Sequence, residues 1–319
     1  MNNKKVVVLG GGTGLSTLLR GLKNFPLDIT AVVSVSDDGK STGRLRKEFN
    51  IPAVGDIRRV LVSLAEIEPL VESVLNYRFT TNSELNGHTV GNLLLTAITN
   101  ITGNMSDGIE AIGSVLNLKG RVLPLTEDNV VLMGKMEDGS IIEGEHNITE
   151  AEKKISDVFY KEKPVICESA IKAIKEADLI IFSMGSLYTS IIPDLISEDI
   201  INAIDESSAK LMYTCNMMTQ PGETDNYNVL DHIKVLNNHL GKRKINVIVV
   251  NNGTVEQSII DKYATLEQKD PIELDEQQRK ELEVQNVEII ENNYVILENE
   301  LIRHNTIKLA TDIFTYLIK

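Results

Sequence analysis

The sequence predicts a Rossmann-like α/β fold, with a mostly parallel sheet, helices on both faces and a small antiparallel β insertion. Short runs of aliphatic residues alternate with segments of helical apolar spacing, and the first run ends in a glycine-rich turn. No linker rich in Pro, Ser or Gly interrupts the 319 residues. We therefore expect one domain over residues 1–319, with the β insertion at about 121–144.

The first element predicted is a buried strand over residues 6–9, followed by a helix over residues 15–22. The turn between them, residues 10–14, is called the first glycine turn below. Free N–H groups at a helix N-terminus can hold an anion, and glycine lets a phosphate approach closely. The candidate phosphate ligands are therefore Gly11, Gly12, Thr13 and Gly14, the alternative being a tight turn without a ligand. Leu15 breaks the dinucleotide fingerprint, which disfavours a nicotinamide dehydrogenase.

Acidic and small polar residues follow the second predicted strand, residues 29–36. Ligands bind beyond the carboxyl ends of parallel strands, so Asp37 and Asp38 are candidates for ribose or base contact and for a divalent cation. A solvated turn is the alternative. Ser41 and Arg44 could contact a phosphate group. Asp56, at the start of the next helix, is either a second metal ligand beside Asp38 or an N-cap.

Three later positions point to the same sheet edge. Asn92 begins a predicted helix four residues after His88, and each is either a ligand contact or an internal hydrogen-bonding residue. The predicted strand over residues 179–182 runs into the second glycine turn, residues 183–190, whose candidate ligands are Gly185, Ser186, Leu187 and Tyr188. The strand over residues 211–215 ends at Asn216, which we expect to orient the ligand. Together these turns predict a cleft for a nucleoside diphosphate.

The β insertion combines strand-like residues 121–124, 130–136 and 141–142 with a hairpin turn at 137–140. Its strands carry apolar residues, and exposed sheet edges of this kind tend to be covered. We therefore expect a homodimer.

The composition of the chain indicates which kinds of binding partner can be excluded. The net charge of −14 argues against nucleic acid and against anionic membranes, and no apolar run approaches the roughly 20 residues of a membrane span. Cys167 and Cys215 are the only cysteines, and the chain shows no secretory signal. We expect a cytoplasmic protein whose partner is a small polyanion.

Six motifs, in this order and spacing, resemble those of the CofD-like superfamily, and within it the bacterial YvcK branch, the gluconeogenesis factors: residues 10–14 (GGGTG), 36–39 (SDDG), 55–58 (GDIR), 91–93 (GNL), 185–190 (GSLYTS) and 219–224 (TQPGET). The branch usually has Gly where Lys40 stands and Asn where Arg59 stands. Lys40 adds a cation beside the predicted phosphate site.

The resemblance implies a Rossmann-like fold and two alternative functions. In the YvcK branch it implies a cytoplasmic protein that binds UDP-sugars and supports gluconeogenic growth, cell shape and wall synthesis. In the enzyme branch it implies magnesium-dependent transfer of 2-phospho-L-lactate from a guanosine diphosphate carrier to a deazaflavin alcohol. The motif at 219–224 is a feature of the YvcK branch, and the sequence offers no identifiable base for an acceptor, so we favour a UDP-sugar-binding regulator over the transferase-like enzyme.

Overall fold

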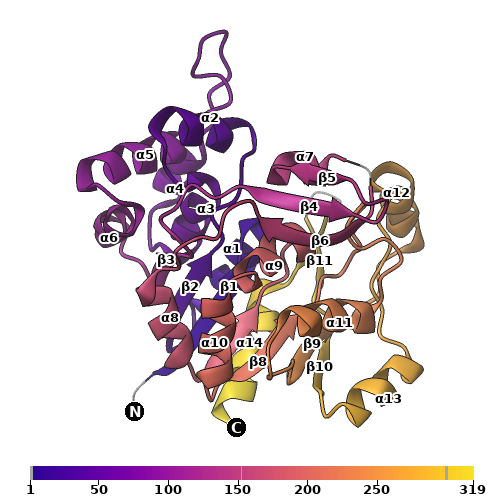
Figure 1. Ribbon diagram of the computed structural model, residues 1–319. Helices are drawn as coiled ribbons and strands as arrows, with labels where there is room; N and C mark the ends of the chain where they lie inside the picture. Colours follow the sequence, from indigo (N-terminus) through magenta and orange to yellow (C-terminus); the bar gives the residue numbers. More distant parts are fainter. Residues whose placement is uncertain (1–2, 152, 299–300) are drawn as a thin grey trace.

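The computed structural model describes residues 3–151, 153–298 and 301–319 (Figure 1). Its centre is a seven-stranded parallel sheet with the order β10-β9-β8-β7-β1-β2-β3. The strands are β1 (Lys4–Gly10), β2 (Leu27–Val33), β3 (Arg121–Pro124), β7 (Leu179–Phe182), β8 (Lys210–Thr214), β9 (Val247–Asn251) and β10 (Glu288–Asn292). The chain builds outward from β1 to β3 on one side and then crosses to β7 on the other. The strand order therefore reverses between β1 and β7, and the predicted Rossmann-like α/β class is confirmed.

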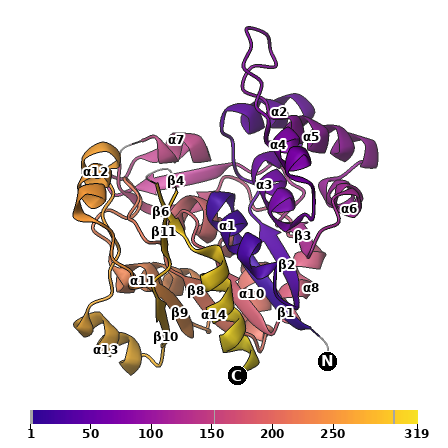
Figure 2. The same cartoon turned by 180° about the vertical axis from the view of Figure 1, so that it is seen from behind.

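Helices cover both faces of this sheet, which explains why β1 is buried along residues 6–10. One face carries α1 (Gly12–Leu22), α3 (Val54–Leu64) and α14 (Thr306–Ile318), seen from behind in Figure 2. The other carries α8 (Glu168–Lys175), α9 (Ile192–Leu195), α10 (Glu198–Glu206) and α11 (Val229–His239), seen in Figure 1. The core that they enclose is aliphatic, as expected for a chain without Trp.

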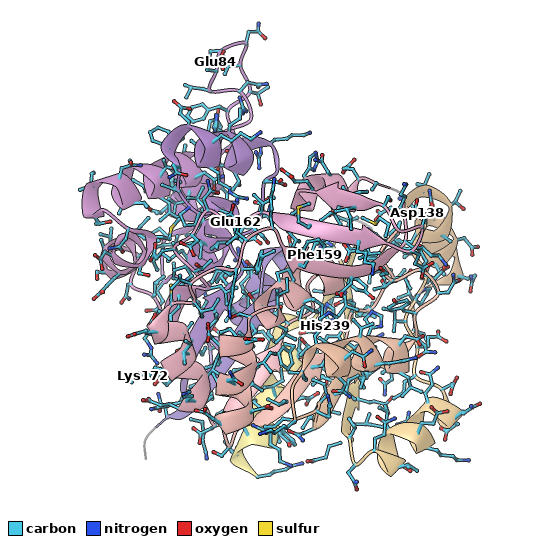
Figure 3. The ribbon with its side chains drawn as sticks, in the orientation of Figure 1. Glu84, Asp138, Phe159, Glu162, Lys172 and His239 are labelled. Atoms are coloured by element: carbon cyan, nitrogen blue, oxygen red, sulfur yellow. The ribbon has the colours of Figure 1, made fainter. Side chains whose placement is uncertain are left out.

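Further helices surround the two ends of the sheet. Beside β3 lie α2 (Lys40–Phe49), α4 (Pro69–Asn76), α5 (Val90–Thr102) and α6 (Met105–Val115), and on the opposite side lie α12 (Gln257–Glu267) and α13 (Glu276–Val284). A loop between α4 and α5 projects from the body, with Glu84 on it (Figure 3). In the described part of the chain, no helix combines the length and the apolar character needed to cross a bilayer.

The predicted β insertion differs from the structure at both of its ends. β3 is not part of it, because residues 121–124 extend the main sheet in parallel with β2. A short apolar run does not reveal its partner, and Pro124 is tolerated because β3 is an edge strand. The antiparallel sheet instead has the order β5-β4-β6 and comprises β4 (Leu132–Met136), β5 (Ile141–Glu143) and β6 (Ile155–Tyr160), with the short α7 (Glu145–Thr149) between β5 and β6. A second antiparallel pair is formed by β11 (Val295–Glu298) and β12 (Leu301–His304).

Candidate functional site

A polar cleft of about 720 Å³ opens where the carboxyl ends of β1, β2, β7 and β8 meet. Both glycine turns line it, as do residues of α3, α7, α12 and β12. This is the position at which α/β sheets bind ligands, because the helices diverge where the strand order reverses.

The two glycine turns are in direct backbone contact. A Cβ atom at Gly14 would lie 2.2 Å from the carbonyl oxygen of Met184, so the first turn of α1 reaches its position only with glycine there. Gly12 has a φ of +63°, a conformation that glycine adopts without strain. The sequence therefore brings the start of α1 against the end of β7 and leaves both turns facing one cleft.

Asp56 connects the first glycine turn to α3. The Gly12 N–H donates to Asp56 Oδ2 at 2.7 Å, and Arg59 Nη1 lies 3.3 Å from Asp56 Oδ1. The predicted N-cap role is wrong, since α3 has Ala53 as its N-cap and Asp56 lies in its first turn. Burial, followed by the charge of Asp37, raises the pKa of Asp56 to about 6.

A second acid, the partly buried Glu145 of α7, also lines the cleft. Burial and then the charge of Asp37 raise its pKa to about 8. Asp37 itself lies against the start of α3, since a Cβ at Gly55 would be 2.5 Å from its Oδ2. The charge of Asp37 thus acts on the carboxyl groups of both Asp56 and Glu145.

Asp38 points elsewhere. Its Oδ1 accepts from the His146 N–H at 2.8 Å, and its Oδ2 lies beside Gly144. That Asp38 and Asp56 share a divalent cation stays a prediction. The acid whose charge acts most strongly on Asp56 is Asp37. No cluster of three or more His, Cys, Asp or Glu side chains suited to a metal ion occurs among residues 3–151, 153–298 and 301–319. A cation here would need further oxygen ligands, such as those of a bound phosphate.

The second glycine turn continues into one π-helical turn, Leu187–Ile191, and is held by Glu223. Glu223 accepts hydrogen bonds from the Ser186 hydroxyl, from the Tyr188 N–H at 3.2 Å and from Gln220 Nε2 at 3.0 Å. Only 3 % of Glu223 is exposed, and this burial raises its pKa. The Tyr188 N–H, in a turn predicted to hold a phosphate, is therefore bound to a carboxylate of the protein itself.

Asn216 follows β8 and faces the second glycine turn. Its Nδ2 donates to the Gly185 carbonyl oxygen at 3.0 Å. Its Oδ1 is buried and has no hydrogen-bond partner among the residues that the structure describes. A buried acceptor of this kind is costly unless a donor reaches it, and because Asn216 lines the cleft, that donor could be a ligand N–H or O–H.

Comparison with known proteins places this site in a family. A sequence profile described as 2-phospho-L-lactate transferase CofD matches residues 6–295. The chain belongs to the CofD family. It is 46 % identical to the gluconeogenesis factor of Bacillus subtilis over 308 residues, covering 96 % of each chain. It is 45 % identical to that of Halalkalibacterium halodurans over 311 residues, covering 97 % of this chain and 95 % of the relative.

Solved structures of the family agree with the fold. A crystal structure of a protein from Bacillus halodurans superposes with a TM-score of 0.93 at 45 % identity and covers 98 % of this chain and 99 % of that one. A second crystal structure from that organism, described as a member of the UPF0052 family, gives a TM-score of 0.92 at 44 % identity, with the same coverage. The arrangement of β1, β7 and the cleft between them thus belongs to a CofD-family fold.

The predicted site residues of this CofD-family chain fall into two groups. Those that line the cleft are Gly11, Gly12, Thr13, Gly14, Asp37, Asp56, Gly185, Ser186 and Asn216. Those that lie outside its lining are Asp38, Ser41, Arg44, Asn92, Leu187 and Tyr188.

Three of the outlying predictions have a structural explanation. The Ser41 hydroxyl bonds to His88 Nδ1 at 2.9 Å and accepts from Asn92 Nδ2 at 3.3 Å, all within a buried cluster between α2 and α5. Exposed Arg44 donates to the Glu84 carbonyl oxygen at 3.4 Å, which ties α2 to the projecting loop.

Sequence analysis of this CofD-family chain missed the outer rim of the cleft. That rim includes Tyr263, Glu267 and Lys269 near the end of α12, and residues 301–304 of β12. His304 is notable because burial lowers its pKa to about 4, which keeps the imidazole neutral. These residues belong to none of the motifs found in the sequence. The motif at 219–224 was the one signal on this side of the cleft, and its residues Thr219 and Gln220 do line the cleft.

Proposed function

We propose that this chain binds a nucleoside diphosphate sugar, specifically a UDP-sugar such as UDP-N-acetylglucosamine, and acts through that binding as a cytoplasmic regulator. The name of the gluconeogenesis factors that it resembles suggests gluconeogenic growth as the process. We extend the proposal to cell shape and wall synthesis, which the resemblance of the sequence motifs implies. The observation that carries the proposal is the cleft at the strand-order reversal, where two glycine turns meet backbone to backbone.

The size of the cleft supports such a ligand. Its 720 Å³ lies within the roughly 300–1,000 Å³ of small-molecule sites. Phosphate binding is supported by Thr13 and Gly14, at the start of α1, and by the half-exposed Arg59 guanidinium, all of which line the cleft. The unpartnered Asn216 Oδ1 favours a ligand that also offers an N–H or O–H group.

A magnesium ion fits the acidic side of the cleft as part of this proposal. Magnesium in phosphate sites is usually bound by one or two carboxylates plus phosphate oxygens. Asp37 and Asp56 provide two neighbouring carboxyl groups. Burial and then the charge of Asp37 raise the pKa of Asp56 to about 6, and a cation beside them would offset both effects. When bound, the ion would neutralise charge on the diphosphate.

Transfer chemistry is the second candidate, because those same two acids are what a magnesium-dependent phospholactate transferase requires. We prefer the regulator, since the relatives that match along nearly the whole chain are named gluconeogenesis factors rather than transferases.

Calorimetric titration with UDP-N-acetylglucosamine, UDP-glucose, GDP and NAD, with and without Mg²⁺, tests the proposal. We expect the UDP-sugars to bind and Asn216→Ala to weaken them by about tenfold, the cost of a lost buried hydrogen bond. Asn100→Ala is the matched control, because this exposed amide bonds only within α5 in the described structure. Absence of binding to any ligand at millimolar concentration would contradict the proposal. Mass spectrometry that found cleavage abolished by Asp56→Ala would favour the transferase.

A further inference from the structure

Two hydroxyl groups of the second glycine turn, those of Ser186 and Thr189, direct their protons to groups inside the protein. Ser186 and Thr189 both line the cleft, and their hydroxyl oxygens lie 2.7 Å apart. The Ser186 hydroxyl donates to Glu223 Oε2. The Thr189 proton is therefore directed either to Ser186 Oγ or to Glu223 Oε1, which lies 3.4 Å away. Neither hydroxyl has a proton left for a ligand in this arrangement. Ser186 Oγ also accepts from the Thr189 N–H at 3.2 Å, so the lone pairs open to the cleft are chiefly those of Thr189.

Glu223 is fixed in this role by the donors around it. Besides the two hydroxyls, the Tyr188 N–H and Gln220 Nε2 donate to its carboxylate, at 3.2 Å and 3.0 Å. A phosphate at these donors would lie beside a buried carboxyl group, and a second negative charge there is strongly disfavoured. The Tyr188 end of the second glycine turn is thus already occupied by an acid of the protein.

Asn216 also offers the cleft a hydrogen-bond acceptor. Its Nδ2 donates to the Gly185 carbonyl oxygen at 3.0 Å, and the opposite amide orientation would place two acceptors together. The orientation is therefore fixed, and the buried Oδ1, which lacks a partner within the described residues, is an acceptor.

We propose that Thr189 and Asn216 form an acceptor wall that takes a hydroxyl-bearing ring of the ligand, and that Glu223, acting through Ser186, is the positioning residue that sets this polarity. This inference rests on the proposed function and assigns an orientation to the ligand. The diphosphate lies at the first glycine turn beside Arg59, and a ring with hydroxyl donors lies at the end of β7 and β8. That ring is either the ribose or the transferred sugar, which share this chemistry.

Glu223→Gln tests the polarity of the wall. A glutamine brings an NH₂ group that one hydroxyl must accept, so a hydroxyl proton turns toward the cleft and opposes the ligand hydroxyl. We expect the affinity for UDP-glucose to fall about tenfold, while that for inorganic pyrophosphate is unchanged. Glu127→Gln is the matched control, because Glu127 accepts from the Ser106 hydroxyl and two N–H groups at the start of α6, outside the cleft. It should alter neither affinity.

The affinities for UDP and for 2′-deoxy-UDP determine whether the ring at the acceptor wall is the ribose or the sugar. If the wall binds the sugar, the tenfold loss in Glu223→Gln disappears with UDP. If it binds the ribose, the loss persists with UDP, and the wild-type protein prefers UDP to 2′-deoxy-UDP. Unchanged UDP-glucose binding in Glu223→Gln, or an equal loss of pyrophosphate binding, would overturn the inference.

Thr189→Val provides a second route should Glu223→Gln fail to fold, which a thermal melt would reveal. Valine keeps the shape of threonine and removes the lone pairs, so UDP-glucose should again bind about tenfold more weakly and pyrophosphate equally well. Wild-type affinity for UDP-glucose in this variant would refute the acceptor wall. Failure of the proposed function is distinct, because the wild-type protein would then bind neither UDP nor UDP-glucose.

Discussion

Replacing Asp56 by asparagine should make the protein more stable near neutral pH. In the folded chain, burial raises the pKa of this carboxyl group from 3.8 to about 6. The folded state therefore binds the proton more tightly than the unfolded chain does. Its contribution to stability is complete below pH 3.8 and is lost as the pH rises to about 6. That difference corresponds to about 3 kcal/mol, since each tenfold change in proton affinity is about 1.4 kcal/mol.

Asparagine mimics the protonated acid and can still accept from the Gly12 N–H, so it avoids this loss. Urea unfolding followed by circular dichroism should show Asp56→Asn more stable than wild type by up to about 3 kcal/mol at pH 7.5. The advantage should shrink as the pH approaches 4. Asp261→Asn, at an exposed position of α12, is the control and should change stability little. Equal or lower stability of Asp56→Asn at pH 7.5 would show that burial is not the dominant influence on this group. The ligand affinity of Asp56→Asn should nevertheless fall, so that the variant gains stability and loses function.

Three other outcomes follow from the same geometry. Gly14→Ala should lower the free energy of unfolding by about 1–3 kcal/mol, because its Cβ would lie 2.2 Å from the Met184 carbonyl oxygen; an unchanged urea midpoint would contradict this contact. Binding of UDP-glucose with Mg²⁺ at pH 7 should release about one proton, since Glu145, with a pKa of about 8, is mostly protonated there and a cation favours its ionised form. Titration in buffers of different ionisation enthalpy measures this release, and identical enthalpies would refute it. Light scattering should give about twice the 35.3 kDa chain mass, since β5 and β6 flank β4 and present the outer edges of the small sheet; a mass of 35.3 kDa would exclude the homodimer.

Local sequence patterns were sufficient for β1, β2, β7 and β8 and for the turns that follow β1 and β7. The run at residues 6–14 predicts strand, turn and helix because each of its signals lies within a few positions. Contacts between distant residues were not predictable in this way. Nothing near Asp56 reveals that it accepts from Gly12, 44 residues earlier, and its position at a helix start suggested an N-cap instead.

The same limit explains the polarity of the second glycine turn. Its glycine and hydroxyl residues are typical of an anion site, and the carboxylate that occupies those donors comes from Glu223, 35 residues beyond Tyr188. Likewise, the sequence allowed His88 and Asn92 to be ligand contacts. In the fold, the Ser41 hydroxyl lies between them and bonds to both side chains. Residue types predicted where polar groups gather, but only the fold determines which of them satisfy one another.

The pairing of β1 with β7 has a consequence for how the protein is made. β1 ends at residue 10, and its second neighbour begins at residue 179, so the ribosome must complete more than half of the chain before both edges of β1 can pair. Until then, β1 has one open edge, and an apolar strand with an open edge is prone to pair with other chains. Because the first glycine turn needs Met184 beside it, the ligand site forms only after this late closure. Nascent chains that stop before β7 should therefore depend on chaperones, and ligand should rescue only chains that extend beyond it.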